Sequence, residues 1–221
     1  MDKIKLLAIA ITTVSASAVA LPASAQSAGD VLVRFGPATV MPNDDSGEVE
    51  PLADTGVEVE DGNSLAFTVS YMYTDNIGFS VLGSLPFEHD IKGDKDLDGI
   101  DVATIEHLPP TFIAEYYFDP GSDVRPYVGA GINYTIFSNE DADSELETLV
   151  GGDVDIDLDD SVGLAVMAGV DVDINEDWFF NASLWYIDIE TDAELDTPIG
   201  DLEVNVDIDP WVVMVGVGTT F

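Results

Sequence analysis

The sequence predicts an all-β protein, an eight-stranded antiparallel up-and-down transmembrane β-barrel. Three observations predict this fold. Apolar residues alternate with period two in stretches of about ten residues. The connections between these stretches alternate between tight turns and long acidic tracts. After residue 30, no apolar run is long enough to form a membrane-spanning helix.

The start of the chain is expected to be a targeting segment. Lys3 and Lys5 precede the apolar run 6–14, and Ala23-Ser24-Ala25 supplies the small residues that are typical of a cleavage site. Residues 1–25 are therefore predicted to be a cleaved signal peptide, with a retained anchor as the alternative. Residues 26–221 have a length that suits one domain, the barrel.

Eight segments carry the alternation, and in each of them one face is large and apolar while the other is small, glycine-rich or polar. In the last segment Trp211 and Val213 share one face, whereas Met214 and Gly216 share the other. A soluble sandwich would show a charged, wet second face. Small residues suit the crowded interior of a narrow barrel, so the apolar face is expected to point at lipid. The predicted strands are 31–36, 64–74, 77–86, 111–118, 126–136, 162–173, 180–186 and 211–221.

The connections predict where the chain is located. Residues 75–76, 119–123 and 175–177 are tight turns, whereas 37–63, 87–106, 138–160 and 190–209 are long and acidic. Short turns on one side and long loops on the other are typical of barrels in the outer membrane of Gram-negative bacteria. Both termini are then expected to be periplasmic, with the acidic loops outside the cell and outer-membrane lipid around the barrel.

The charge balance limits the partners of the protein. The chain has 44 acidic and 6 basic residues and a formal net charge of -38. This charge excludes nucleic acid as a natural partner, because phosphate contacts need Lys and Arg. It fits either a high-salt habitat, where salt screens the repulsion, or divalent-ion binding at the cell surface. The chain has no cysteine, so a disulfide framework is excluded.

Aromatic residues fall at the ends of the predicted strands, where the two membrane surfaces would lie. With periplasmic termini, one interface girdle lies at the short-turn end and the other at the loop end. The short-turn girdle is Tyr71, Tyr73, Tyr116, Phe118, Trp178 and Phe221, and the loop-end girdle is Tyr134, Phe137, Tyr186 and Trp211.

Two groups of residues are expected to face the lumen. Four of them are charged and would have to pair, because an unpaired buried charge is costly. These residues either seal the lumen or set the polarity of a conduction path. The charged group is Arg34, Glu115, Arg125 and Asp171, and the apolar group is Met72, Leu82, Met167, Trp185 and Met214. The apolar residues fit either a dry plug or a passage for apolar molecules.

Metal binding and catalysis have weak signals. Asp94, Asp96 and Asp98, followed by Gly99, match the opening of a calcium loop, but Ile105 occupies the twelfth position and no helices are expected to flank it. A solvated acidic loop is the better interpretation, so no metal or cofactor is expected. In a second acidic tract, 153–160, Asp alternates with Val, Ile and Leu, which predicts a strand extending beyond the membrane rather than an ion site. The only histidines are His89 and His107, and no nucleophile motif surrounds the nearby Ser84. The protein is therefore not expected to be an enzyme.

The central part of the chain resembles the OmpW family of outer-membrane barrels. The resemblance lies in Leu108-Pro109-Pro110-Thr111, Glu115-Tyr116-Tyr117-Phe118 and the stretch 125–135 that begins Arg125-Pro126-Tyr127. It implies a narrow, partly apolar eight-stranded barrel that passes small hydrophobic solutes across the outer membrane. The end of the chain at Phe221 resembles the assembly signal of such barrels, which implies the assembly machinery as a partner. The alternative function is a structural or surface-interaction barrel with a sealed lumen.

Overall fold

The structure is a computed structural model that describes residues 26–43, 45–46, 49 and 54–221. The predicted signal peptide, residues 1–25, lies outside the described residues, and its assignment stays a prediction.

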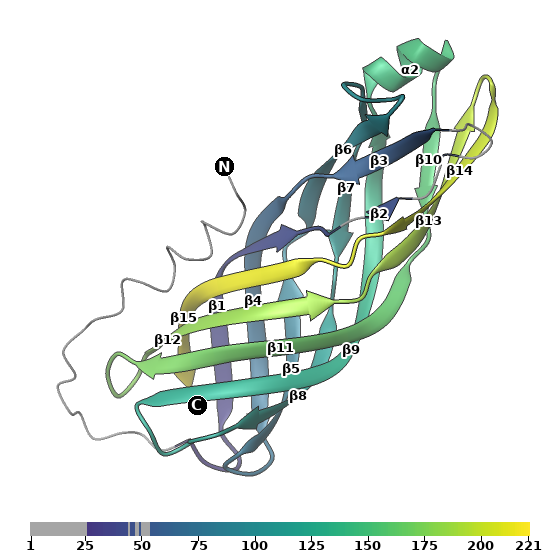
Figure 1. The fold of residues 1–221 in the computed structure, drawn as a ribbon. Coiled ribbons are helices and arrows are strands. Elements are labelled where there is room, and N and C mark those ends of the chain that lie inside the picture. The colour runs from purple at the N-terminus through teal and green to yellow at the C-terminus, as the bar shows by residue number, and fades with distance from the viewer. Residues whose placement is uncertain (1–25, 44, 47–48, 50–53) are drawn as a thin grey trace.

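Within the described residues, eight strands close into an antiparallel barrel, which confirms the predicted fold class (Figure 1). Each strand pairs with the next along the wall, and the last pairs with the first to complete the closure. The barrel strands are β1 (Val31–Met41), β4 (Gly62–Met72), β5 (Ile77–Ser84), β8 (Thr111–Tyr117), β9 (Val124–Ala142), β11 (Ser161–Asp173), β12 (Phe179–Ile187) and β15 (Trp211–Thr220).

The wall of the barrel places large apolar side chains outside and small or polar ones inside. On β4, Leu65 and Phe67 are exposed, whereas Thr68 and Ser70 are buried. The interior is crowded, because a Cβ atom at Gly129 would lie 2.5 Å from Cγ2 of the inward-facing Ile113. This inversion of the usual soluble pattern is what a narrow barrel surrounded by lipid requires.

At one end, hereafter the loop end, the sheet continues well beyond the barrel (Figure 1). From the upper part of β9 the barrel sheet extends through β7 (Asp101–Leu108), β6 (Phe87–Lys95) and β3 (Thr55–Val59). A separate four-stranded sheet contains β10 (Asp155–Leu158), β13 (Glu190–Thr197), β14 (Gly200–Asp207) and β2 (Asp45–Ser46). The short helix α2 (Ser144–Val150) starts at Asp143, whose carboxylate accepts from the Glu145 N–H, and ends at Gly151.

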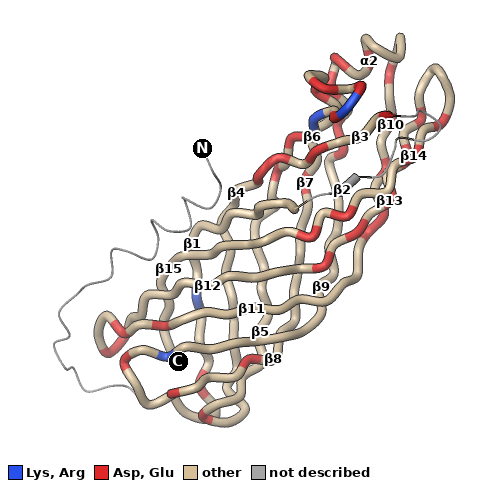
Figure 2. The backbone as a smooth tube through the Cα atoms, viewed as in Figure 1, with Lys and Arg blue, Asp and Glu red and all other residues tan. Residues whose placement is uncertain are grey.

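These extensions differ from the loops expected of the acidic tracts. In the tracts, acidic residues alternate with apolar ones, as in the run from Thr191 to Asp196 of β13, so they carry the same period-two signal as the barrel strands. Except in residues 153–160, this alternation was not used to predict strands, because the charge of the tracts suggested loops. Figure 2 shows the result, with Asp and Glu gathered at the loop end and few in the barrel wall.

The opposite end, hereafter the turn end, is closed by tight connections. Val31 and Phe221 exchange two backbone hydrogen bonds there, of 3.0 and 2.9 Å, so the last residue lies beside the start of β1. In the described part of the chain, no helix has the length and apolar character needed to cross a membrane.

Candidate functional site

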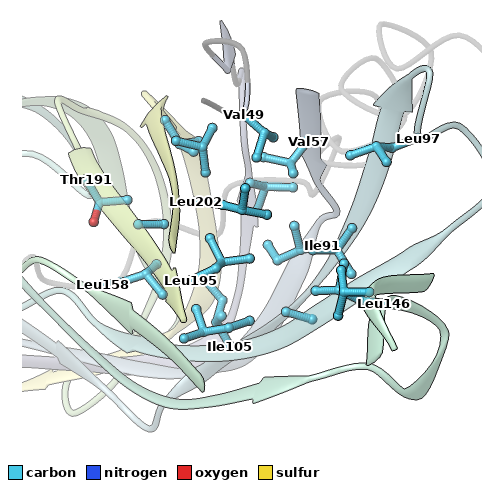
Figure 3. Close-up of a pocket in the computed structure, with 18 of the residues that line it drawn as sticks. Val49, Val57, Ile91, Leu97, Ile105, Leu146, Leu158, Thr191, Leu195 and Leu202 are labelled. Carbon is cyan, nitrogen blue, oxygen red and sulfur yellow. The ribbon is translucent and has the colours of Figure 1, made fainter. Parts of the chain in front are cut away.

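A cavity of about 210 Å³, hereafter the loop-end cavity, lies between the sheet extensions. Of the described residues that line it, only Thr191 has a polar side chain. Figure 3 shows Leu158 and Leu195 on one side of the cavity, facing Ile91 and Leu146 on the other. Two lining residues reach the surface, Leu149 at 56% and Ile199 at 61% exposure, so the cavity opens at the tip of the molecule.

This cavity was not predicted from the sequence, although the sequence contains a signal for it. On β13 the inward Ala193 and Leu195 alternate with the outward Asp192 and Glu194. The carboxylates keep the outer face of the sheet wet, while the apolar side chains between them form a dry interior. The same alternation was noted for residues 153–160, where it predicted a strand extending beyond the membrane, and β10 forms there.

A second, much smaller cavity of about 10 Å³, hereafter the barrel cavity, lies inside the barrel below the first. That volume holds about one water molecule. Three residues of the expected apolar lumen path line it, namely Leu82, Trp185 and Met214. Ser84, Phe87 and Pro109 complete one of its sides.

His89 and His107 lie between the two cavities, at a level hereafter called the throat. Their rings are buried and stacked, with centroids 4.8 Å apart. His89 Nδ1 lies 2.7 Å from the Glu60 carbonyl oxygen, and because a carbonyl only accepts, Nδ1 must donate. Burial lowers the pKa of His89 and lowers the pKa of His107 to about 3, so both imidazoles are neutral at pH 7.

The throat does not assemble a hydrolytic triad. The Nε2 atoms of both histidines and the Ser84 hydroxyl have no hydrogen-bond partner, so the serine is not activated by either imidazole. The His89 partner is a backbone carbonyl rather than a carboxylate.

A buried ion pair closes the lumen toward the turn end. Arg34 Nη2 lies 2.6 Å from Asp171 Oδ2, and both side chains are at most 1% exposed. The same guanidinium donates to the Ser70 hydroxyl at 2.9 Å and to the Tyr117 hydroxyl at 2.6 Å. It also lies over the Tyr127 ring, 4.9 Å from the centroid. This network, hereafter the polar plug, fills the interior at its level.

The other two expected lumen charges join the plug with partners that the sequence analysis did not name. Glu115 accepts hydrogen bonds of 2.8 Å from the hydroxyls of Ser80 and Tyr117. Arg125 pairs with Asp173 at 2.6 Å rather than with Glu115 or Asp171. The register of β9 and β11 places Asp171 directly opposite Arg125, but the guanidinium reaches diagonally to Asp173, two positions further along β11 toward the turn end.

The plug divides the expected apolar path. Along the inward face of β4, Ala66 lines the barrel cavity, Ser70 belongs to the plug, and Met72 follows at the turn end. Met167 lies opposite Trp185 in the register of β11 and β12 and is 5% exposed. All five apolar lumen residues are buried, but polar side chains separate Met72 from the cavity.

The aromatic residues of the two expected girdles lie on the outside of the barrel, with one exception. The exposed fractions run from 41% for Tyr134 to 76% for Phe221, and include Tyr71, Tyr73, Tyr116, Phe118, Trp178 and Trp211. Tyr186 is half-buried and donates to Asp209 at 3.0 Å. Phe137 differs from the expectation, because its ring points inward and packs edge-on against His107.

The calcium-like segment forms a β-hairpin. Asp94, Asp96 and Asp98 lie where β6 turns into β7, and the turn is held by backbone bonds such as that from Gly93 N–H to Ile100 O at 2.9 Å. Among residues 26–43, 45–46, 49 and 54–221, no three acidic, histidine or cysteine side chains are grouped to hold a metal ion.

The ladder between β5 and β8 has a gap beside the barrel cavity. The β5–β8 pairing ends at Leu82 and Thr111, and pairing resumes between β6 and β7 at Phe87 and His107. The segments between these pairs, 83–86 and 108–110, are hereafter the seam. Pro109 and Pro110 contribute no N–H to a ladder, which explains why pairing stops there.

An eight-stranded barrel with an apolar outer band and exposed aromatic residues defines the class of outer-membrane β-barrel proteins. The OmpW family model matches residues 27–221, so the chain belongs to the OmpW family and lies in the outer membrane of a Gram-negative bacterium. This confirms the resemblance seen in the sequence.

Known proteins agree with this assignment. The chain is 42% identical to outer membrane protein W of Vibrio cholerae, over 90% of this chain and 92% of that protein. The crystal structure of OprG from Pseudomonas aeruginosa is similar with a TM-score of 0.83 and 36% identity, over 89% of this chain and 97% of that one. A more distant relative, 27% identical over 74% of each chain, is the Pseudomonas aeruginosa "Dibenzothiophene metabolism operon protein PahQ".

Proposed function

We propose that the protein passes small hydrophobic solutes from the outside of the cell into the outer membrane, with no catalytic step. The loop end faces outward and both termini are periplasmic. The observation that carries the proposal is the loop-end cavity, whose lining is apolar except for Thr191 and which opens at the tip of the molecule. Transfer of an apolar solute from water into such a cavity is favourable by about 25 cal/mol per Å² buried.

The polar plug argues against a straight route to the periplasm. Arg34, Asp171 and Tyr117 fill the lumen below the barrel cavity, and an apolar solute would have to separate a buried ion pair to pass. The solute instead leaves sideways through the seam. No ladder bonds need to break there, and lipid outside the wall offers an apolar solute a favourable destination.

The relatives support an apolar cargo. PahQ is described as a protein of a dibenzothiophene metabolism operon, and dibenzothiophene is an apolar aromatic compound. Of the residues that were expected to form the apolar lumen path, Leu82, Trp185 and Met214 lie on the proposed route of the solute. Met72 lies beyond the polar plug and is not on that route. The C-terminal strand, with Phe221 at its end, is proposed to be recognised by the outer-membrane assembly machinery.

The test measures entry of an apolar fluorescent dye into cells of a Gram-negative host that lacks its own members of this family. Intact cells are needed because apolar dyes cross simple lipid vesicles without help. Ala193→Trp places a large ring in the loop-end cavity and should slow dye entry several-fold. Glu194→Trp is the matched control, since it puts the same ring on the outer face of the same strand.

The seam is tested with the pair Ser84→Cys and Pro109→Cys, two residues that both line the barrel cavity. Oxidation to a disulfide should slow dye entry, and a reductant should restore it. If Ala193→Trp and the oxidised pair both leave dye entry unchanged, the cavity and seam are not a route.

One observation favours a second function, that of a sealed structural or surface-interaction barrel. The polar plug closes the lumen with paired charges, as that function would require. Unchanged dye entry in both variants would support it and move attention to the acidic outer face of the loop end.

A further inference from the structure

Three buried polar atoms without a hydrogen-bond partner gather around the throat. They are His89 Nε2, His107 Nε2 and Ser84 Oγ. Of the other such atoms in the described residues, Asn181 Oδ1 and Arg125 Nε belong to the polar plug, and Gln26 Oε1 lies at the turn end. Thr68 Oγ1 lies on β4 opposite Leu82, at the level of the barrel cavity. An unpaired buried polar atom costs free energy, so a group of them on one route calls for an explanation.

The register of β6 and β7 places the two histidines on the route between the cavities. Ile91 and Ile105 line the loop-end cavity, and Phe87 lines the barrel cavity. Phe87 pairs with His107 and His89 pairs with Ile105, so the imidazoles occupy the inward positions between the two linings. On this side of the barrel, the imidazoles therefore separate the two cavities.

The chemistry of the two rings defines what they can bind. Because His89 Nδ1 donates to the Glu60 carbonyl, Nε2 of the neutral ring is an acceptor. His107 Nε2 can donate or accept, depending on its tautomer, and the Ser84 hydroxyl can do both. The throat therefore presents one fixed acceptor and two adaptable groups.

We propose that the throat selects apolar solutes that carry one neutral hydroxyl group, such as phenols and long-chain alcohols. This inference rests on the proposed passage of hydrophobic solutes and names their class. The hydroxyl donates to His89 Nε2, while its oxygen accepts from His107 Nε2 or Ser84. A pure hydrocarbon leaves all three atoms unpaired.

The surroundings of the throat exclude a carboxylate or other anion. Asp61 and Asp90 lie close enough to His89 to act on it electrostatically. Phe87 and Phe137 pack around His107 and keep the site dry. An anion would lose its hydration and meet like charges, so only the neutral hydroxyl gains at this point.

Gly62 provides the room that the His89 ring uses. A Cβ atom at position 62 would lie 2.6 Å from His89 Nε2 and 2.5 Å from Cε1. The missing side chain thus allows the ring edge with the unpaired nitrogen to stay inside the barrel instead of being pushed aside.

The first experiment compares 1-naphthol with 1-methylnaphthalene, which differ by a hydroxyl in place of a methyl group of similar size. The protein is placed in lipid nanodiscs, free of any histidine tag and labelled with ¹⁵N-histidine. The chain has two histidines, so the side-chain nitrogen resonances belong to the throat. Naphthol should shift the unprotonated Nε2 resonance of His89, and methylnaphthalene should not.

The second experiment measures the affinity of both probes by fluorescence, with empty nanodiscs as the background. Naphthol should bind about tenfold more tightly than methylnaphthalene, the ratio expected for one added hydrogen bond. His89→Phe and His107→Phe should abolish that ratio. The control Ile105→Val, next to the throat on β7, should change the affinity of both probes equally.

The outcomes separate this inference from the proposed function. If both probes bind equally and neither shifts the His89 resonance, the hydroxyl selection is refuted while hydrophobic passage stands. If neither probe binds, both proposals are refuted. If a Phe variant fails to fold, the labelled wild-type spectrum still decides the question.

Discussion

Removing the charge of Asp171 tests whether the polar plug is held by ion pairing. In the substitution Asp171→Asn the side chain keeps its shape, but the buried guanidinium of Arg34 loses its counter-charge. Asp171 accepts hydrogen bonds from Arg34 Nε at 3.0 Å and Nη2 at 2.6 Å, and one from Asn181 at 2.8 Å. Leaving one partner of such a buried pair uncompensated costs about 3–5 kcal/mol of unfolding free energy.

The double variant Arg34→Met with Asp171→Leu should recover most of that loss. Removing both charges also removes both desolvation penalties, so a well-packed apolar pair is about neutral relative to the ion pair. The coupling between the two sites in a double-mutant cycle should therefore be large, of the order of a few kcal/mol.

The assay is urea unfolding of the protein refolded into lipid vesicles, followed by tryptophan fluorescence. Asp101→Asn is the control, because it removes the carboxylate that pairs with Lys92 at the surface of the loop end, where both side chains are at least 36% exposed. That change should be small, since water and salt screen the pair. The reasoning is refuted if Asp171→Asn costs less than about 1 kcal/mol, or if the single losses simply add in the double variant.

Three further predictions concern salt, pH and packing. The midpoint temperature of unfolding should rise between low salt and molar NaCl, because salt screens the repulsion between like charges. Glu194 lies opposite carboxylates on both neighbouring strands, so Glu194→Gln should stabilise the protein at low salt. A flat salt response would contradict this prediction. The folded state keeps His107 neutral down to about pH 3, so the unfolded state binds a proton at this residue first as the pH falls. The free energy of unfolding should therefore decrease below about pH 6.5, by up to about 1.4 kcal/mol per pH unit. In urea titrations at each pH, His107→Phe should lack this component. Gly62→Ala should destabilise by about 1–3 kcal/mol because its Cβ would overlap the His89 ring, whereas Gly121→Ala, with nothing within 4 Å, should be neutral in the same assay.

The alternation of side chains was readable from the sequence because it is a local property of a strand. Leu65 and Ser70 fall on opposite faces through their spacing alone, and the same rule placed Arg34 and Asp171 inside. The rule also applied to the acidic tracts, but there the charge drew attention away from the alternating Ala193 and Leu195. The loop-end cavity was thus within reach of the sequence and was missed by interpretation.

The contacts between inward side chains were not readable in this way. Arg34 and Asp171 are 137 positions apart, and their pairing depends on how the strands tilt and close around the barrel. The partner of Arg125 could not be read even from the register of β9 and β11, which places Asp171 opposite it, because the side chains pair diagonally and Arg125 contacts Asp173.

By itself, the sequence determined the fold class, the family and which face of each barrel strand meets lipid, since these follow from periodicity along single segments. Only the tertiary structure decided that the lumen is split into a loop-end cavity, a throat and a polar plug. Those features join side chains from several strands, and strand pairing, a nonlocal property, sets which of them meet.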